Sequence, residues 1–130
     1  MSGATDGRRL IALVADDEPD IRELLVVLLT RAGYDVLEAG NGKEALCLAQ
    51  LHRPDLAVID VRMPELDGYE TTRALRADPS TASTKVVLLT VSVRDGERRQ
   101  ALAAGADLYV RKPFGGRTFA RIIREMVERV

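Results

Sequence analysis

The sequence predicts a single α/β domain in which five β-strands alternate with five α-helices around a parallel sheet. Apolar runs of strand length recur along the chain, and the segments between them have the apolar spacing of helices. Most of the strand-length runs are continuously apolar, which is typical of strands covered by helices on both faces. The predicted strands are residues 10–15, 34–39, 55–60, 85–90 and 107–110.

Three of the predicted helices have recognisable ends. Pro19 suits the first position of a helix, and Asn41 is a good N-cap for a second helix at residues 42–52. A third helix is expected to begin at Asp67 and to end near residue 77. The first helix has an apolar stripe that we expect to be buried: Ile21, Leu24, Leu25, Leu28 and Leu29.

The last two helices differ in how firmly their sequences anchor them. Residues 94–104 include Gly96 and only one large aliphatic residue, Leu102. Little apolar burial holds such a helix, so we expect it to be a moving part. The final helix has the clearest amphipathic pattern, with apolar residues at Phe119, Ile122, Ile123, Met126, Val127 and Val130.

Composition limits the possible classes of protein. A chain of 130 residues that is 46% hydrophobic and 30% charged fits one globular domain. We expect residues 1–9 to be a flexible leader and residues 10–130 to be the domain. A net charge of −1 carries no nucleic-acid signature, and no apolar run is long enough to span a membrane, so we expect no direct binding to either. The single cysteine, Cys47, excludes an internal disulfide and is expected to pack inside its helix, which favours a cytoplasmic location.

Charge is uneven along the chain, because the last third carries more basic than acidic residues. These basic side chains can be read as ordinary solvated helix faces or as a docking surface for an acidic partner protein.

Polar side chains follow the predicted strands at the points where they end. Asp16 and Asp17 follow the first strand, Asp60 ends the third, Thr90 ends the fourth, and Lys112 follows the fifth. In an open parallel sheet, ligands bind beyond the carboxyl ends of the strands. We therefore expect these five side chains to meet at one edge. Each aspartate alone is more often a helix cap or a turn residue, but the combination favours a functional site.

Three carboxylates at one edge repel one another, and a hard divalent cation such as Mg²⁺ is the natural counter-charge. Asp60 is then available as a nucleophile that forms an aspartyl phosphate. Lys112 and the Thr90 hydroxyl would bind the other oxygens of the transferring phosphoryl group.

In combination, these motifs resemble the receiver-domain family of two-component signalling, over about residues 10–130. The resemblance implies a flavodoxin-like three-layer sandwich whose parallel sheet has the strand order 2-1-3-4-5. The matching segments are residues 15–18 (ADDE), 59–64 (IDVRMP), 67–68 (DG), 88–90 (LLT) and 105–114 (GADLYVRKPF).

The resemblance also implies a signalling switch rather than an enzyme. A sensor histidine kinase or a histidine phosphotransfer protein would donate the phosphoryl group in a Mg²⁺-dependent reaction. The surface of the fourth helix, fifth strand and fifth helix would then change shape for a downstream protein partner; a homodimer linked to phosphorylation is left open. Carried over by position, the implied roles are Asp60 as phosphoacceptor, Asp16, Asp17, Asp60 and the Arg62 backbone carbonyl as Mg²⁺ ligands, Lys112 as phosphate-binding lysine, and Thr90 and Tyr109 as switch residues.

Two departures from the family pattern stand out. Val91 follows Thr90 where the family usually has a small residue, and we expect it to narrow access to the acyl phosphate. Gly115 and Gly116 replace the usual polar cap of the last helix, which weakens its capping.

Two rival functions remain at this point. An aspartate-nucleophile phosphatase of the haloacid-dehalogenase type expects a second aspartate two residues after the nucleophile, where this chain has Arg62. A receiver-like interaction domain that no longer needs phosphate is supported only by Val91.

Overall fold

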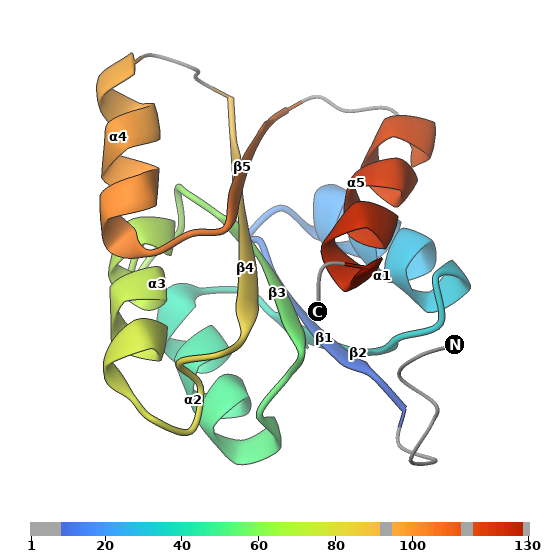
Figure 1. The fold of residues 1–130 in the computed structure, drawn as a ribbon, viewed down its shortest axis with the longest axis horizontal. Coiled ribbons are helices and arrows are strands. Elements are labelled where there is room, and N and C mark those ends of the chain that lie inside the picture. Colours follow the sequence, from blue (N-terminus) through green and yellow to red (C-terminus); the bar gives the residue numbers. More distant parts are fainter. Residues whose placement is uncertain (1–8, 92–94, 113–115, 129–130) are drawn as a thin grey trace.

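The computed structural model describes residues 9–91, 95–112 and 116–128; the side chains of Asp95 and of residues 126–128 are outside the description. Within these ranges, five parallel strands form one sheet in the order β2-β1-β3-β4-β5, so the predicted α/β fold and strand order are confirmed (Figure 1). The elements are β1 (Ile11–Ala15), α1 (Pro19–Arg31), β2 (Asp35–Ala39), α2 (Gly42–His52), β3 (Leu56–Asp60), α3 (Gly68–Ala77), β4 (Lys85–Thr90), α4 (Asp95–Ala104), β5 (Leu108–Arg111) and α5 (Gly116–Glu128).

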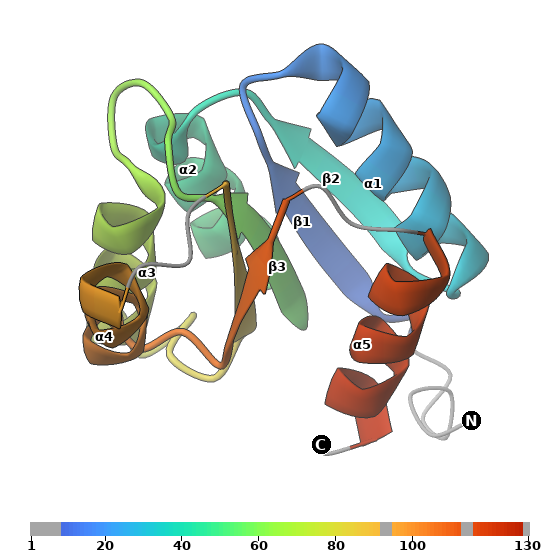
Figure 2. The ribbon, with the colours of Figure 1, turned by 90° about the horizontal axis from the view of Figure 1, so that it is seen from above.

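Helices cover both faces of the sheet, as the continuous apolar strands predict. Figures 1 and 2 show α1 and α5 on one face and α2, α3 and α4 on the other. Successive strand residues point to opposite faces, so in β3 Val58 packs in the cluster with α1 and α5 while Ile59 packs with the other three helices. The sheet therefore has two separate cores.

The strand register gathers the carboxyl ends of four strands at one edge. Ala15 of β1 pairs with Ile59 of β3, and Asp60 pairs with Leu89 of β4. The chain runs from β1 to its neighbour β2 and then crosses back past β1 to β3, so the strand order reverses between β1 and β3. This is the position at which open α/β sheets bind ligands.

Local sequence signals explain where the helices begin. Pro19 occupies the first turn of α1, as predicted. The Asn41 side chain accepts a 2.7 Å hydrogen bond from the Glu44 backbone N–H and caps α2. Asp67 and Glu70 form a reciprocal capping box that starts α3 next to the site.

Two predicted burials were wrong. Leu24 belongs to the apolar stripe of α1 but is 41% exposed, because the sheet and α5 cover only the other side of that helix. Cys47 is exposed, since α2 packs through its small residues Gly42, Ala45 and Ala49. The expectation of little apolar burial in α4 is confirmed, since Leu102 is 59% exposed and the buried residues among its described side chains are Ala101 and Ala104.

Several expectations concern residues that the structure does not describe. They are the leader at residues 1–8, Gly115, the side chains of Met126 and Val127, and Val130.

Candidate functional site

The structure brings the five predicted strand-end residues together. Asp16 follows β1 directly, Asp60 and Thr90 are the last residues of β3 and β4, and Lys112 follows β5. These four polar side chains are buried, which is unusual for charged residues and requires local compensation; Asp17 is exposed beside them. The elements of the fold therefore place a polar, mostly buried cluster at one edge of the sheet.

The carboxylates face one another closely enough to share a cation. Oxygen atoms of Asp16, Asp17 and Asp60 lie within 4.8 Å of one another. The Lys112 ammonium lies between two of them, 2.9 Å from Asp16 Oδ2 and 3.2 Å from Asp60 Oδ1, with Glu18 Oε1 at 3.7 Å. Lys112 thus neutralises part of the charge and leaves a net negative site.

Burial and charge both act on Asp60. Burial raises the pKa of Asp60 to about 6, and the neighbouring Asp16 carboxylate adds to the shift, while Lys112 opposes it. For Lys112, burial alone lowers the pKa, but the hydrogen bond to Asp16 and the charges of Asp60 and Asp16 outweigh burial and raise it. Lys112 is consequently a cation at neutral pH, and Asp60 is ionised at an energetic cost that a further cation would reduce.

The donor set fits Mg²⁺. Hard carboxylate oxygens are its preferred protein ligands, and one or two carboxylates together with phosphate oxygens are its usual partners. Burial and the Asp16 charge raise the pKa of Asp60 in spite of the neighbouring Lys112, so a further cation at this site would favour the ionised carboxylate. The predicted contribution of the Arg62 backbone carbonyl stays a prediction.

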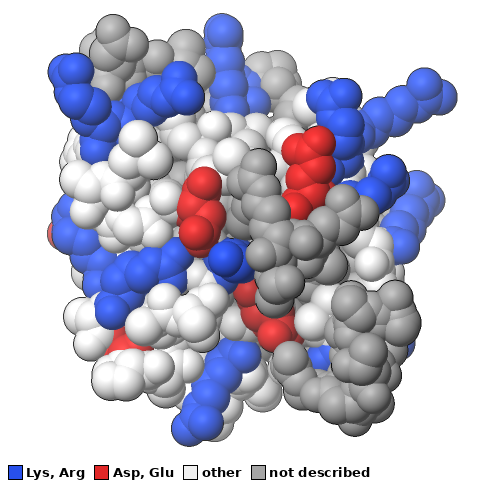
Figure 3. All heavy atoms as spheres, viewed as in Figure 1, with Lys and Arg blue, Asp and Glu red and all other residues white. Residues whose placement is uncertain are grey.

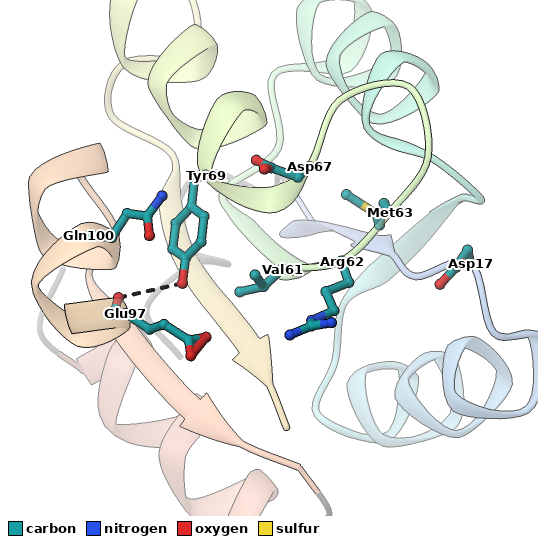
Figure 4. Close-up of a pocket in the computed structure, with 8 residues that line it drawn as sticks. All are labelled: Asp17, Val61, Arg62, Met63, Asp67, Tyr69, Glu97 and Gln100. Atoms are coloured by element: carbon teal, nitrogen blue, oxygen red, sulfur yellow. Dashed lines mark hydrogen bonds between the residues drawn. The ribbon is translucent and has the colours of Figure 1, made fainter. Parts of the chain in front are cut away.

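Two adjoining cavities open at the cluster. The smaller has a volume of about 210 Å³. The larger, of about 600 Å³, shares Asp17 and Arg62 with it and extends toward α3 and α4 (Figure 4). Val91 lines the smaller cavity and is 63% exposed, and its expected narrowing of access to an acyl phosphate stays a prediction. The residues of the smaller cavity are Asp17, Glu18, Asp60, Arg62, Thr90, Val91 and Lys112.

Tyr69 is a component of the site that the sequence did not indicate. Its ring is buried in the first turn of α3, and its hydroxyl donates a 3.4 Å hydrogen bond to the Glu97 carbonyl in α4 (Figure 4). The Tyr69 side chain is also hydrogen-bonded to that of Tyr109, and burial together with this bond raises the pKa of Tyr69. Tyr69 therefore links α3, α4 and β5. The sequence shows only an aromatic residue after Asp67-Gly68, and nothing local reveals these distant partners.

A model of the response regulator receiver domain matches residues 12–124. The chain belongs to the response-regulator receiver family. This assignment removes the phosphatase alternative, and it places the domain among the signalling switches of two-component systems. Receiver domains generally bind Mg²⁺ at an acidic pocket, and this receiver domain presents such a cluster of aspartates.

Similar proteins support the same family. A probable transcriptional regulator, ycf27, of Cyanophora paradoxa is 40% identical over 117 residues, which cover 90% of this chain and 48% of that protein. The phosphate regulon transcriptional regulatory protein PhoB of Pseudomonas aeruginosa is 35% identical over 90% of this chain and 51% of its own length. The receiver domain thus spans about half the length of these curated relatives.

Solved structures share the fold over nearly the whole chain. The chemotaxis response regulator CheY4 of Vibrio cholerae superimposes with a TM-score of 0.86 at 31% identity, covering 91% of this chain and 98% of that one. The BeF3-activated DrrB receiver domain superimposes with a TM-score of 0.83 at 27% identity, covering 93% and 99%. In the part of the receiver domain that the structure describes, no helix has the length and apolar character needed to cross a membrane.

Proposed function

We propose that Asp60 accepts a phosphoryl group from a histidine of a sensor kinase or phosphotransfer protein, and that the acyl phosphate reshapes the α4–β5–α5 surface for a downstream protein. The supporting observation is the position of Asp60. Its carboxylate ends a buried strand, opens into the 210 Å³ cavity and lies 3.2 Å from the Lys112 ammonium. A reactive oxygen and a phosphate-binding cation are thus next to each other.

The transfer is a displacement at phosphorus. An oxygen of ionised Asp60 forms the new O–P bond while the N–P bond of the phosphohistidine breaks, and the imidazole leaves with the electron pair. No base is required, because the nucleophile carries no proton. Asp16, Asp17 and Asp60 would hold Mg²⁺, with the Arg62 carbonyl as a further ligand, and this ion supplies compensation for the charge on the transferring group. Lys112 would exchange its contact with Asp60 for a phosphoryl oxygen.

The proposed switch uses two side chains on the same face of the sheet. Thr90 pairs with Arg111, and Leu88 pairs with Tyr109, so Thr90 and Tyr109 are diagonal neighbours on adjacent strands. Alternation along β4 puts Thr90 on the same face as Leu88, which packs in the core beneath α2, α3 and α4 together with Tyr109. If the Thr90 hydroxyl moves to the phosphoryl group, Tyr109 can turn inward into the space beside it, and α4 loses its present support.

Intact mass measurement after incubation with acetyl phosphate tests the acceptor residue. We expect one phosphoryl adduct that requires Mg²⁺, disappears in Asp60→Asn and remains in Asp35→Asn, a matched change at an exposed position of β2. An adduct that persists in Asp60→Asn would overturn the assignment. So would an unmodified native chain after treatment with both acetyl phosphate and a phosphorylated histidine donor.

A further inference from the structure

The outer side of α1 has a straight stripe of four exposed residues: Asp20, Leu24, Val27 and Arg31. They are spaced by four, three and four positions, which aligns them on one side of a helix as in the seam of a coiled coil. Leu24 and Val27 are each 41% exposed, and Figure 2 shows α1 on the outside of the fold with α5 beside only its C-terminal half. The stripe is therefore accessible along its whole length.

The two ends of α1 carry opposite charge. Asp20 lies in the first turn and Glu18 just before it, whereas Arg31 is in the last turn. Arg117 and Arg124 of α5 stand beside Arg31 around a cavity of about 640 Å³ between the two helices. Figure 3 shows Lys and Arg side chains on the side of the molecule where Figure 1 places α5 and α1, and also over α3 and α4. Among the described residues, no ion pair engages Asp20 or Arg31.

We infer that this stripe is an interface for a second copy of the chain, with the two α1 helices antiparallel. Asp20 and Arg31 are equally far from the middle of the stripe, and so are Leu24 and Val27. A two-fold axis at the middle therefore sets each Asp20 opposite an Arg31 of the second copy, and each Leu24 opposite a Val27 of the second copy. Parallel helices would instead place Asp20 against Asp20 and Arg31 against Arg31, which like-charge repulsion disfavours.

The size of the stripe makes the pairing weak and reversible. A helix of 13 residues is about 20 Å long, so two such stripes bury less than the roughly 1,000 Å² expected of a stable interface. We expect a dissociation constant of about 10⁻⁴ M, within about tenfold. The pairing leaves the face of α4 free and does not depend on the phosphorylation proposed above.

Charge reversal separates this pairing from other causes of association. Dimerisation is measured by sedimentation at chain concentrations from about 10 µM to about 1 mM. Asp20→Arg and Arg31→Asp should each raise the dissociation constant of the dimer at least about tenfold. The double variant should recover dimerisation, since its charges are merely exchanged. Leu24→Glu should also abolish dimerisation. Leu51→Glu, a matched change at an exposed leucine on α2, should not. Thermal unfolding of each variant checks that the fold is retained.

Cross-linking tests the antiparallel register. In a Cys47→Ser background, which removes the exposed native thiol, Leu24→Cys and Val27→Cys chains are mixed and oxidised. The mixed disulfide should form faster than either symmetric one. A chain that remains monomeric to about 1 mM, or association that survives Asp20→Arg, or equal rates for all three disulfides, would overturn the interface.

Discussion

Replacing Asp60 with asparagine should stabilise the protein at neutral pH. The ordinary pKa of 3.8 holds for Asp60 in the unfolded chain, and folding raises it to about 6 through burial and the Asp16 charge. The folded state thus binds the Asp60 proton more tightly than the unfolded state does. The stability that the protonated carboxyl contributes is therefore fully present below pH 3.8 and is lost as the pH rises through 6. At about pH 7.5 the loss is about 3 kcal/mol, because each pKa unit corresponds to about 1.36 kcal/mol.

Urea unfolding in the absence of divalent ions measures this cost. Asparagine carries no charge to desolvate, and Lys112 keeps its 2.9 Å contact with Asp16. We expect Asp60→Asn to gain about 3 kcal/mol at about pH 7.5 and about 1.5 kcal/mol at about pH 5, where the native carboxyl is mostly protonated. Asp35→Asn, which loses only an exposed ion pair, should change stability by less than about 1 kcal/mol at either pH. A destabilised Asp60→Asn at neutral pH, or the same gain at both pH values, would refute the electrostatic reasoning.

Three further perturbations follow from contacts near the site. Gly68→Ala should destabilise the fold by about 2 kcal/mol and slow phosphoryl uptake, since the new Cβ would come within 2.6 Å of the Asp60 carbonyl oxygen. At Gly96 a new Cβ would meet no atom within 4 Å, so Gly96→Ala should instead stabilise the fold by about 0.5–1 kcal/mol. Arg76→Lys should lower the free energy of unfolding in urea by about 2 kcal/mol. The reason is that a lysine cannot replace a guanidinium that donates hydrogen bonds to three loop carbonyls and a carboxylate. A change below about 0.5 kcal/mol would contradict this reasoning. Tyr69→Phe should lower the free energy of unfolding by about 1 kcal/mol and speed amide hydrogen exchange in α4. Unchanged exchange would show that the Tyr69 hydroxyl does not stabilise that helix.

The residues that the sequence placed correctly are those marked by their immediate neighbours in the chain. Asp60 and Thr90 end apolar runs, and a run of buried strand residues must stop at the edge of the sheet. The strand order required more, because pairing β1 with β3 joins segments that are far apart in the chain, and no periodicity encodes that choice. The order followed from the family resemblance, and the structure confirms it.

The errors have a shared physical cause. A pattern of apolar residues shows which side of a helix can be buried, but not how much of that side the rest of the fold covers. For α1 the uncovered part includes Leu24, and for α2 it includes Cys47. Tyr69 was missed for a related reason, since its hydroxyl meets a carbonyl 28 residues away in α4. Its importance depends entirely on that distant helix.

The weak anchoring of α4 gives the proposed switch a reason to act there. Among the described side chains of α4, the buried ones are alanines, so few methyl groups resist displacement of the helix. The Tyr69 hydroxyl supplies a polar contact to its first turn. The same side chain is hydrogen-bonded to Tyr109, so an inward turn of Tyr109 would break that bond and release the contact of Tyr69 with α4 as well. Each bond is worth about 1 kcal/mol net, so losing both would change the equilibrium between two positions of α4 by about tenfold to thirtyfold. A phosphoryl group on Asp60 needs to supply no more than that difference, which a single charge-assisted hydrogen bond from Thr90 can approach.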